Sequence, residues 1–233
     1  HSMKKILSYF LILCTTFSLC ACSSSVEKSD VITVINAFNK TLKADSASTS
    51  GTFQTNEDKM NIKLDIIQNG NLQVAFNMGL EAGGNTADDF LSFYIKDEKT
   101  YLSSMGVTSQ SVLKNIGIDS TKKLSTYNPF LDFTDDEIVS FFTSSKKKND
   151  TITLEMNGKS LATLLDAFGT ISISKGTIEA IIKNDVLSSL KITIKGYQAM
   201  EEASSDVDIV IDVKIENVNG LKEIKFPSDL ENF

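Results

Sequence analysis

The side chains most often used in catalysis are scarce in this sequence. Its only histidine is His1, which stands with Ser2 ahead of Met3 and is expected to be a remnant of expression. All 23 basic residues are lysines, against 30 acidic residues, and the net charge is -7. The chain therefore lacks the guanidinium fork that grips phosphates, and its acidic balance argues against nucleic-acid binding. No Gly-x-Ser-x-Gly elbow, phosphate loop or dinucleotide fingerprint is present, so we expect no catalytic residues, no enzymatic activity and no cofactor.

Three acidic residues near the end of the chain, Asp206, Asp208 and Asp212, are the sharpest candidates for metal ligands. They alternate with apolar residues, which is typical of a strand with one wet face. Alternate strand residues are too far apart to converge on one ion, and a calcium loop would need a turn containing glycine. We therefore expect no metal site, and instead weak cross-strand pairs of these acids with Lys191 and Lys195.

The three cysteines all lie near the N-terminus, where one of them is a candidate for covalent modification. A positively charged start, Met3-Lys4-Lys5, precedes an apolar stretch, Ile6 to Leu19, that is shorter than the roughly 20 residues a membrane-spanning helix needs. This layout indicates a signal peptide. The segment Leu19-Cys20-Ala21-Cys22 resembles the bacterial lipobox, whose last cysteine receives a diacylglyceryl group before cleavage. The alternative is ordinary cleavage after a small residue, which leaves free thiols.

The lipobox implies a division of the chain into three parts. Residues 1–21 are expected to be the expression remnant and the signal peptide, residues 22–30 a Ser-rich lipid-anchored tether, and residues 31–233 a single β-rich domain. The two acyl chains of the diacylglyceryl group, such as palmitate, would hold Cys22 stably in the extracytoplasmic face of the bacterial cell membrane. The mature chain would keep no second thiol, so no disulfide is expected.

The N-terminal part of this domain is expected to be a helix followed by a meander. Asp30 is a candidate N-cap for an amphipathic helix ending near Lys43. Phe53 marks a first strand, and the alternation of Met60 to Ile66 marks a second. Asn69-Gly70 predicts a tight hairpin, with positive φ at both positions, into the strand Asn71 to Met78. An acidic loop at 81–89 and a strand pair at 90–96 and 100–103 follow.

The middle of the chain has helical spacing. We expect helices over Val107 to Ile116 and Thr134 to Thr143, the second opened by a capping box of Thr134 and Glu137, and a short helix from Ser160 to Phe168. Lys146 to Lys148 is the single basic run and is read as a solvated loop rather than a binding patch. Long strands over 173–183, 186–197 and 207–218 complete the sheet, with a tight turn at 184–185 and a last edge strand at 221–227.

The lipobox, the tether, the first helix, the large antiparallel sheet with inserted helices and the closing Leu221-Lys222-Glu223-Ile224-Lys225-Phe226-Pro227 together resemble the LolA/LolB/LppX-like group of bacterial lipoproteins and carriers. The segment Phe93 to Leu102 is similar to a hairpin of the Gram-positive members. The resemblance is architectural and covers most of the mature chain, although Arg and Trp are absent. It implies an α+β fold, in which a large curved antiparallel sheet forms an open half-barrel and the N-terminal and inserted helices cover its concave face.

In that group the concave face holds acyl chains or another apolar ligand. Candidates for lining such a site here are Met60, Phe76, Met78, Phe141 and Phe142, although apolar residues on strand and helix faces serve equally well as plain core. We expect a membrane-anchored lipoprotein that binds a lipid or other apolar ligand non-covalently. The alternative is a cell-envelope module that binds a protein partner and has a packed core without a ligand cavity.

Overall fold

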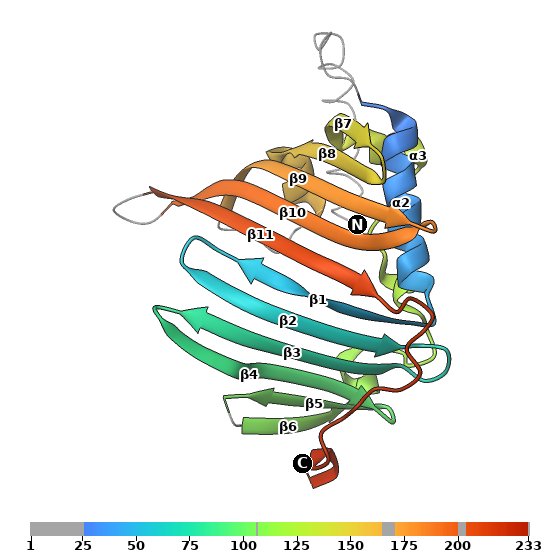
Figure 1. The fold of residues 1–233 in the computed structure, drawn as a ribbon, viewed down its shortest axis with the longest axis vertical. Helices are drawn as coiled ribbons and strands as arrows, with labels where there is room; N and C mark the ends of the chain where they lie inside the picture. The colour runs from blue at the N-terminus through green and yellow to red at the C-terminus, as the bar shows by residue number, and fades with distance from the viewer. Residues whose placement is uncertain (1–25, 106, 165–170, 200–203, 233) are drawn as a thin grey trace.

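The computed structural model describes residues 26–105, 107–164, 171–199 and 204–232 (Figure 1). The expected signal peptide, Cys22 and the start of the tether lie outside these residues. Within the described part, no helix is both long enough and apolar enough to span a membrane.

Eleven strands form one antiparallel sheet in the order β6-β5-β4-β3-β2-β1-β11-β10-β9-β8-β7. The sheet is twisted and does not close on itself (Figure 1). The strands are β1 (Ser46–Gln54), β2 (Asp58–Ile67), β3 (Gln73–Ala82), β4 (Asn85–Lys96), β5 (Lys99–Ser104), β6 (Val107–Val112), β7 (Phe142–Lys148), β8 (Thr151–Asn157), β9 (Ile171–Lys183), β10 (Val186–Ala199) and β11 (Ser204–Glu216).

Short helices connect or cover these strands. They are α2 (Lys28–Lys43), α3 (Asp135–Ser140), α4 (Gly158–Leu164) and the 3-10 helices η1 (Leu113–Ile116), η2 (Leu124–Tyr127) and η3 (Leu230–Asn232). The expected fold class, a large open antiparallel sheet with an N-terminal helix and inserted helices, is confirmed.

Two meanders build the sheet, β1 to β6 and β7 to β11, and they meet where β1 pairs with β11. Local turn chemistry explains two of the reversals. The predicted turn at Asn184 and Asp185 is confirmed, with φ of 54° and 64°, and Asp97 and Glu98 have φ of 50° and 63°. Such left-handed pairs match the right-handed twist of the strands they join.

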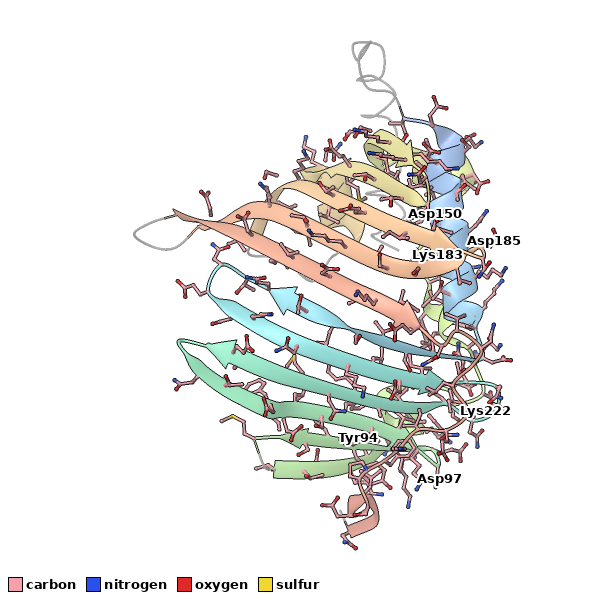
Figure 2. The ribbon with its side chains drawn as sticks, in the orientation of Figure 1. Tyr94, Asp97, Asp150, Lys183, Asp185 and Lys222 are labelled. Atoms are coloured by element: carbon pink, nitrogen blue, oxygen red, sulfur yellow. The ribbon has the colours of Figure 1, made fainter. Side chains whose placement is uncertain are left out.

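The two faces of the sheet differ in chemistry. The inner face carries the main core, in which α2 packs on strands β7 to β10. The outer face is charged and, at Ile67 and Ala75, is covered by the C-terminal segment through Ile224. Figure 2 shows Lys222 on this segment and Tyr94 on the same side of the sheet. The buried core residues of the inner face are Val31, Val34, Ala37, Ile138, Phe141, Phe142, Ile152, Leu154, Met156, Leu161, Ala180, Leu187, Ile194 and Ile209.

The helix predicted over Val107 to Ile116 is wrong. Residues 107–112 form β6, which pairs with β5, and only the 3-10 turn η1 follows. Valine, threonine and serine fill most of β6, and these residues fit a pleated strand better than a helix. The spacing of apolar residues led to the wrong prediction, because apolar residues at both ends of a short segment fit the period of a helix as well as that of a strand.

Two lysine-rich or glycine-rich segments predicted as loops are strands instead. Lys146 to Lys148 end β7 and pair with Thr151 to Thr153 across a turn at Asn149, whose φ is 55°. The expected loop at 81–89 is shortened to Gly83 and Gly84, both with positive φ, and β4 begins at Asn85. Pairing with a neighbouring strand overrides the unfavourable composition in both places.

Four boundaries also differ from expectation. The helix predicted over Thr134 to Thr143 ends at Ser140, and Phe142 and Thr143 already belong to β7. Glu27, not Asp30, is the N-cap of α2. Asn69 and Gly70 have no positive φ. β2 ends at Ile67 and β3 begins at Gln73, so the connection is longer than the expected two-residue turn, and the buried Gln68 side chain in it bonds to Leu42 and Leu124. The last strand predicted at 221–227 is absent from the described sheet. Asn217 and Asn219 turn the chain with φ of 54° and 62°, and the segment then packs on the outer face.

Candidate apolar ligand site

An apolar cavity of about 220 Å³ lies between the inner face of the sheet and the elements that cover it. All of its lining side chains are apolar, and none is titratable. They are Val34, Ile35 and Phe38 of α2, Pro129 and Phe130 of the loop after η2, Phe142 of β7, Met156 of β8, Leu161 of α4, Ile178 of β9, and Leu187, Leu190 and Ile192 of β10. Dispersion contacts and the release of water are the interactions that such a wall offers.

Periodicity explains how these elements face the same space. Phe38 lies three residues after Ile35 and four after Val34, so all three residues share one side of α2. Leu190 and Ile192 alternate with polar residues of β10, so both point to the inner face. The apolar side of α2 and the inner face of β10 thus form two of the cavity's walls.

The loop after η2 forms one side of the cavity. Phe130 meets Phe38 edge to face, with ring centroids 6.2 Å apart and planes at 87°. Asn128 is buried, donates to Oδ1 of Asn39 at 3.0 Å, and accepts from the Phe130 N–H at 3.0 Å. Pro129 lines the cavity and is also exposed, so the cavity reaches the surface at this loop.

Hydrogen bonds fix the C-terminal end of α2 over the site. Nε2 of Gln68 donates to the carbonyls of Leu42 and Ala44, each at 2.7 Å, and its Oε1 accepts from the Leu124 N–H at 2.8 Å. Thr41 accepts from the N–H of Leu187 at 3.0 Å. The helix is therefore tied both to η2 and to a strand that lines the cavity.

The N-terminal end of α2 is held by weaker, exposed contacts. Nζ of Lys28 lies 2.8 Å from a carboxylate oxygen of Asp136 on α3. The hydrogen bond to Asp136 and its negative charge raise the pKa of Lys28 above its ordinary value. Because both side chains are mostly exposed, this ion pair contributes little to stability.

The apolar inner surface continues from the cavity into the other half of the sheet. One register row crosses six strands without a polar side chain and consists of Leu154, Ile178, Ile192, Ile211, Phe53 and Met60. Beyond it the inner faces of β2 to β4 carry further half-buried residues. We call this surface the apolar trough: Phe53, Met60, Ile62, Leu64, Phe76, Met78 and Phe93. Leu113 and Ile118 pack on it at one end.

The candidate lining residues fall into three places. Phe142 lies in the cavity wall. Phe141 is 2% exposed and packs edge to face on Phe133, so its ring belongs to the core beside the cavity. Met60, Phe76 and Met78 lie in the apolar trough, opposite Leu80, Leu64 and Ile62 respectively. Their role in ligand binding stays a prediction.

Most of the cavity wall was not singled out by sequence reasoning. Phe38 and Phe130 come from segments far apart in the chain, and only the tertiary fold brings them together. A signal for Phe38 was available, since it belongs to the apolar stripe expected for the first helix. No sequence pattern marks Pro129 and Phe130 as residues of the cavity wall, because the loop that carries them has no regular spacing of apolar residues.

The acidic residues of β11 lie on the opposite, outer face. Asp208 and Asp212 are exposed and stand opposite Lys195 and Lys191 in the strand register, as expected, although no ion pair joins them among the described side chains. No group of three or more possible metal ligands gathers in the part of the chain that the structure describes.

No protein-family model matches the chain, and no curated protein matches it in sequence. Among solved structures, LprF from Mycobacterium bovis is similar with a TM-score of 0.46 and 10% identity, over 88% of this chain and 99% of that one. The LolA superfamily protein NE2245 from Nitrosomonas europaea gives 0.29 and 9%, over 87% and 96%. A porin-like protein from Bacteroides uniformis gives 0.26 and 8%, over 75% and 97%. Because every TM-score is below 0.5, these likenesses do not tell us what this chain binds.

Proposed function

We propose that this protein binds a lipid or another apolar ligand non-covalently, with an apolar end of the ligand in the cavity beneath α2. The observation that carries the proposal is a cavity of about 220 Å³ with a wholly apolar wall. An apolar cavity of about 150 Å³ is already large enough to stay dry and to take up benzene. A ligand that fills this one gains apolar burial and leaves no polar group unpaired.

The apolar trough supports an elongated ligand. It continues the cavity wall through the row from Ile192 to Met60, and its side chains are half-buried rather than fully packed. A chain whose end occupies the cavity can lay further methylene groups along this surface. Its polar head would remain outside, because the cavity wall offers it no hydrogen-bond donor or acceptor.

The protein is further proposed to act at the extracytoplasmic face of the bacterial cell membrane, anchored through acylated Cys22. The sequence from Met3 to Cys22 supports this assignment. Since α2 begins at Lys28, residues 23–27 can span at most about 18 Å, which would keep the cavity near the bilayer. We propose a role in contact rather than catalysis, because no titratable side chain lines the cavity.

Binding is tested with the purified full chain and the fluorescent fatty acid cis-parinaric acid. Ile192→Phe places a larger ring into the cavity wall, and we expect it to weaken binding at least about tenfold by taking up the free volume. Thr193→Phe is the matched control, because Thr193 is the next residue of β10 and points to the outer face. This control should bind as the unchanged protein does.

Two results would refute the proposal. One is that the unchanged protein neither binds the probe nor releases an apolar molecule on solvent extraction followed by mass spectrometry. The other is that Ile192→Phe and Thr193→Phe bind equally well, because the probe would then sit elsewhere on the protein. Thermal unfolding of both variants controls for loss of the fold.

A further inference from the structure

The two edges of the open sheet are β7 and β6, and they are protected very differently. An edge strand exposes unpaired backbone groups, and natural proteins usually shield it with charges or with a covering element. On β7, the exposed lysines 146–148 supply the charges. The start of α2 covers part of the same strand, since the Glu27 N–H donates to Oγ of Ser145 at 2.7 Å.

The β6 edge is less protected. The C-terminal segment lies beside its outer face, where Pro227 and Leu230 line the same hollow as Thr108 (Figure 1), but the strand itself carries no charged side chain. Residues 100–113 carry no charged side chain, although 23% of the chain is charged. The strand itself reads Val-Thr-Ser-Gln-Ser-Val, without proline, and pairs with β5 alone. Its second row of backbone donors and acceptors is therefore free to pair with another strand.

Exposed apolar side chains gather at this edge. Of the six large apolar residues that are exposed in the described part of the chain, four lie on β6 or beside it. Met105 is 78% exposed, Val107 73%, Val112 48% and Leu102 40%. An uncharged edge strand flanked by exposed apolar side chains is the arrangement expected of an interface.

We propose that two copies of this protein associate by antiparallel pairing of their β6 strands. Charge decides in favour of a second copy. The two partners of such a symmetric pair present the same surface to each other. Any charged side chain on the strand would therefore lie near the same charged side chain of the other copy. The protein as a whole is acidic, with a net charge of -7, and would repel a copy of itself elsewhere on its surface. Because β6 itself carries no charged side chain, pairing along this strand brings no like charges of the strand together.

The pairing is consistent with the geometry of the inner face. Antiparallel strands about a twofold axis keep their inner faces on the same side, so the inner surface that includes Leu102 would continue into the second copy. Pairing about the middle of β6 brings Ser109 and Gln110 to the centre of the interface, and the register decides which of the two is opposite its own counterpart. The side chains of Val107 and Val112, at the two ends of the strand, would lose exposed area against the partner strand.

Disulfide cross-linking of the full chain in bacterial membranes tests the proposal. Ser109→Cys and Gln110→Cys are made separately, because the register decides which of the two faces its own copy. Asn61→Cys is the control, since Asn61 is also an exposed polar residue of a strand but lies on β2, in the interior of the sheet. After oxidation with copper phenanthroline, at least one β6 variant should form a dimer, while Asn61→Cys and the unchanged chain should remain at background.

A charge placed on the edge provides the second arm. Adding Gln110→Lys to Ser109→Cys should lower the cross-linked fraction about tenfold, because one lysine from each copy would then lie on the same face near the centre of the interface, where like charges repel each other. Adding Asn61→Lys to Ser109→Cys should leave the cross-linked fraction unchanged. The proposal is overturned if both β6 cysteines stay at background, if the control cross-links as well as they do, or if Gln110→Lys has no effect. Pairing of β6 with a strand of another protein would appear as a cross-linked species of a different mass.

Discussion

Replacing Gly51 by alanine should destabilise the protein strongly, because Gly51 lies in β1 at the junction between the two meanders. It stands opposite Val213 of β11. A Cβ atom at this position would lie 1.9 Å from the carbonyl oxygen of Asp212 and 2.7 Å from Cα of Val213. Both atoms belong to the backbone, so no side-chain rotation can relieve the clash. Real Cβ contacts begin near 3.0 Å, and the strands would have to separate by about 1.1 Å (3.0 less 1.9).

A displacement of this size breaks the ladder hydrogen bonds on either side of Gly51. Each broken backbone bond costs about 1 kcal/mol, and more where the groups stay buried and unpaired, so a loss of about 3 kcal/mol in the free energy of unfolding is expected. With a urea m-value of about 2 kcal/mol/M, the midpoint of unfolding should fall by about 1.5 M. Far-UV circular dichroism during urea titration measures this shift.

Gly70→Ala is the matched control. A Cβ there would meet no atom within 4 Å, and the φ of Gly70 is not positive. Alanine at position 70 should therefore leave stability unchanged or raise it by less than about 1 kcal/mol, through the lower entropy of the unfolded chain. The reasoning is refuted if Gly51→Ala and Gly70→Ala unfold at the same urea concentration.

Two further predictions concern the polar contacts around the site. Gln68→Ala should lower the free energy of unfolding by about 2 to 3 kcal/mol, because two carbonyls at the end of α2 and the Leu124 N–H lose their partner, whereas Gln73→Ala should cost less than about 1 kcal/mol. Chemical denaturation checks both variants. The Asp119 carboxylate accepts from the hydroxyl and the N–H of Thr121, and these bonds hold the pKa of Asp119 below its ordinary value. A depressed folded-state pKa means that the stabilisation is present above the unfolded pKa and is lost as pH falls through the folded one. In an NMR titration, Thr121→Val should move the Asp119 pKa back upward, and an unchanged pKa would contradict this cause.

Strands β2 and β3 of the first meander and the long strands after Ile171 were accessible from the sequence because their inner and outer residues alternate cleanly. Met60 to Ile66 and Val207 to Ile215 show this period, and the structure places both runs in the sheet. The capping box of Thr134 was also readable, and the Glu137 N–H donates to Oγ1 of Thr134 at 3.2 Å. The alternating strands and the capping box depend on residues that are close in the sequence and on the exposure of one face of the sheet to water.

The segments that were misread depend on distant partners. The spacing of apolar residues within 107–112 does not distinguish a strand from a helix, and the pairing with β5 decides between them. The closing residues 221–227 have the composition of a strand, but Phe226 finds a better contact on Tyr94, edge to face at 6.2 Å, than an edge of the sheet would offer. The cavity was inaccessible for the same reason, since Phe130 enters its wall from a loop without a period.

The pairing of β1 with β11 has a consequence for the order in which this chain can fold. The partners Gln54 and Val210 are joined directly in the sheet, although more than half of the chain lies between them. The hairpins within each meander can form early. The pairing of β1 with β11 can form only after the last strand has left the ribosome. Such long-range contacts fold slowly. A chain that has to cross a membrane before folding would gain time from this arrangement, since its central seam is the last part to become available.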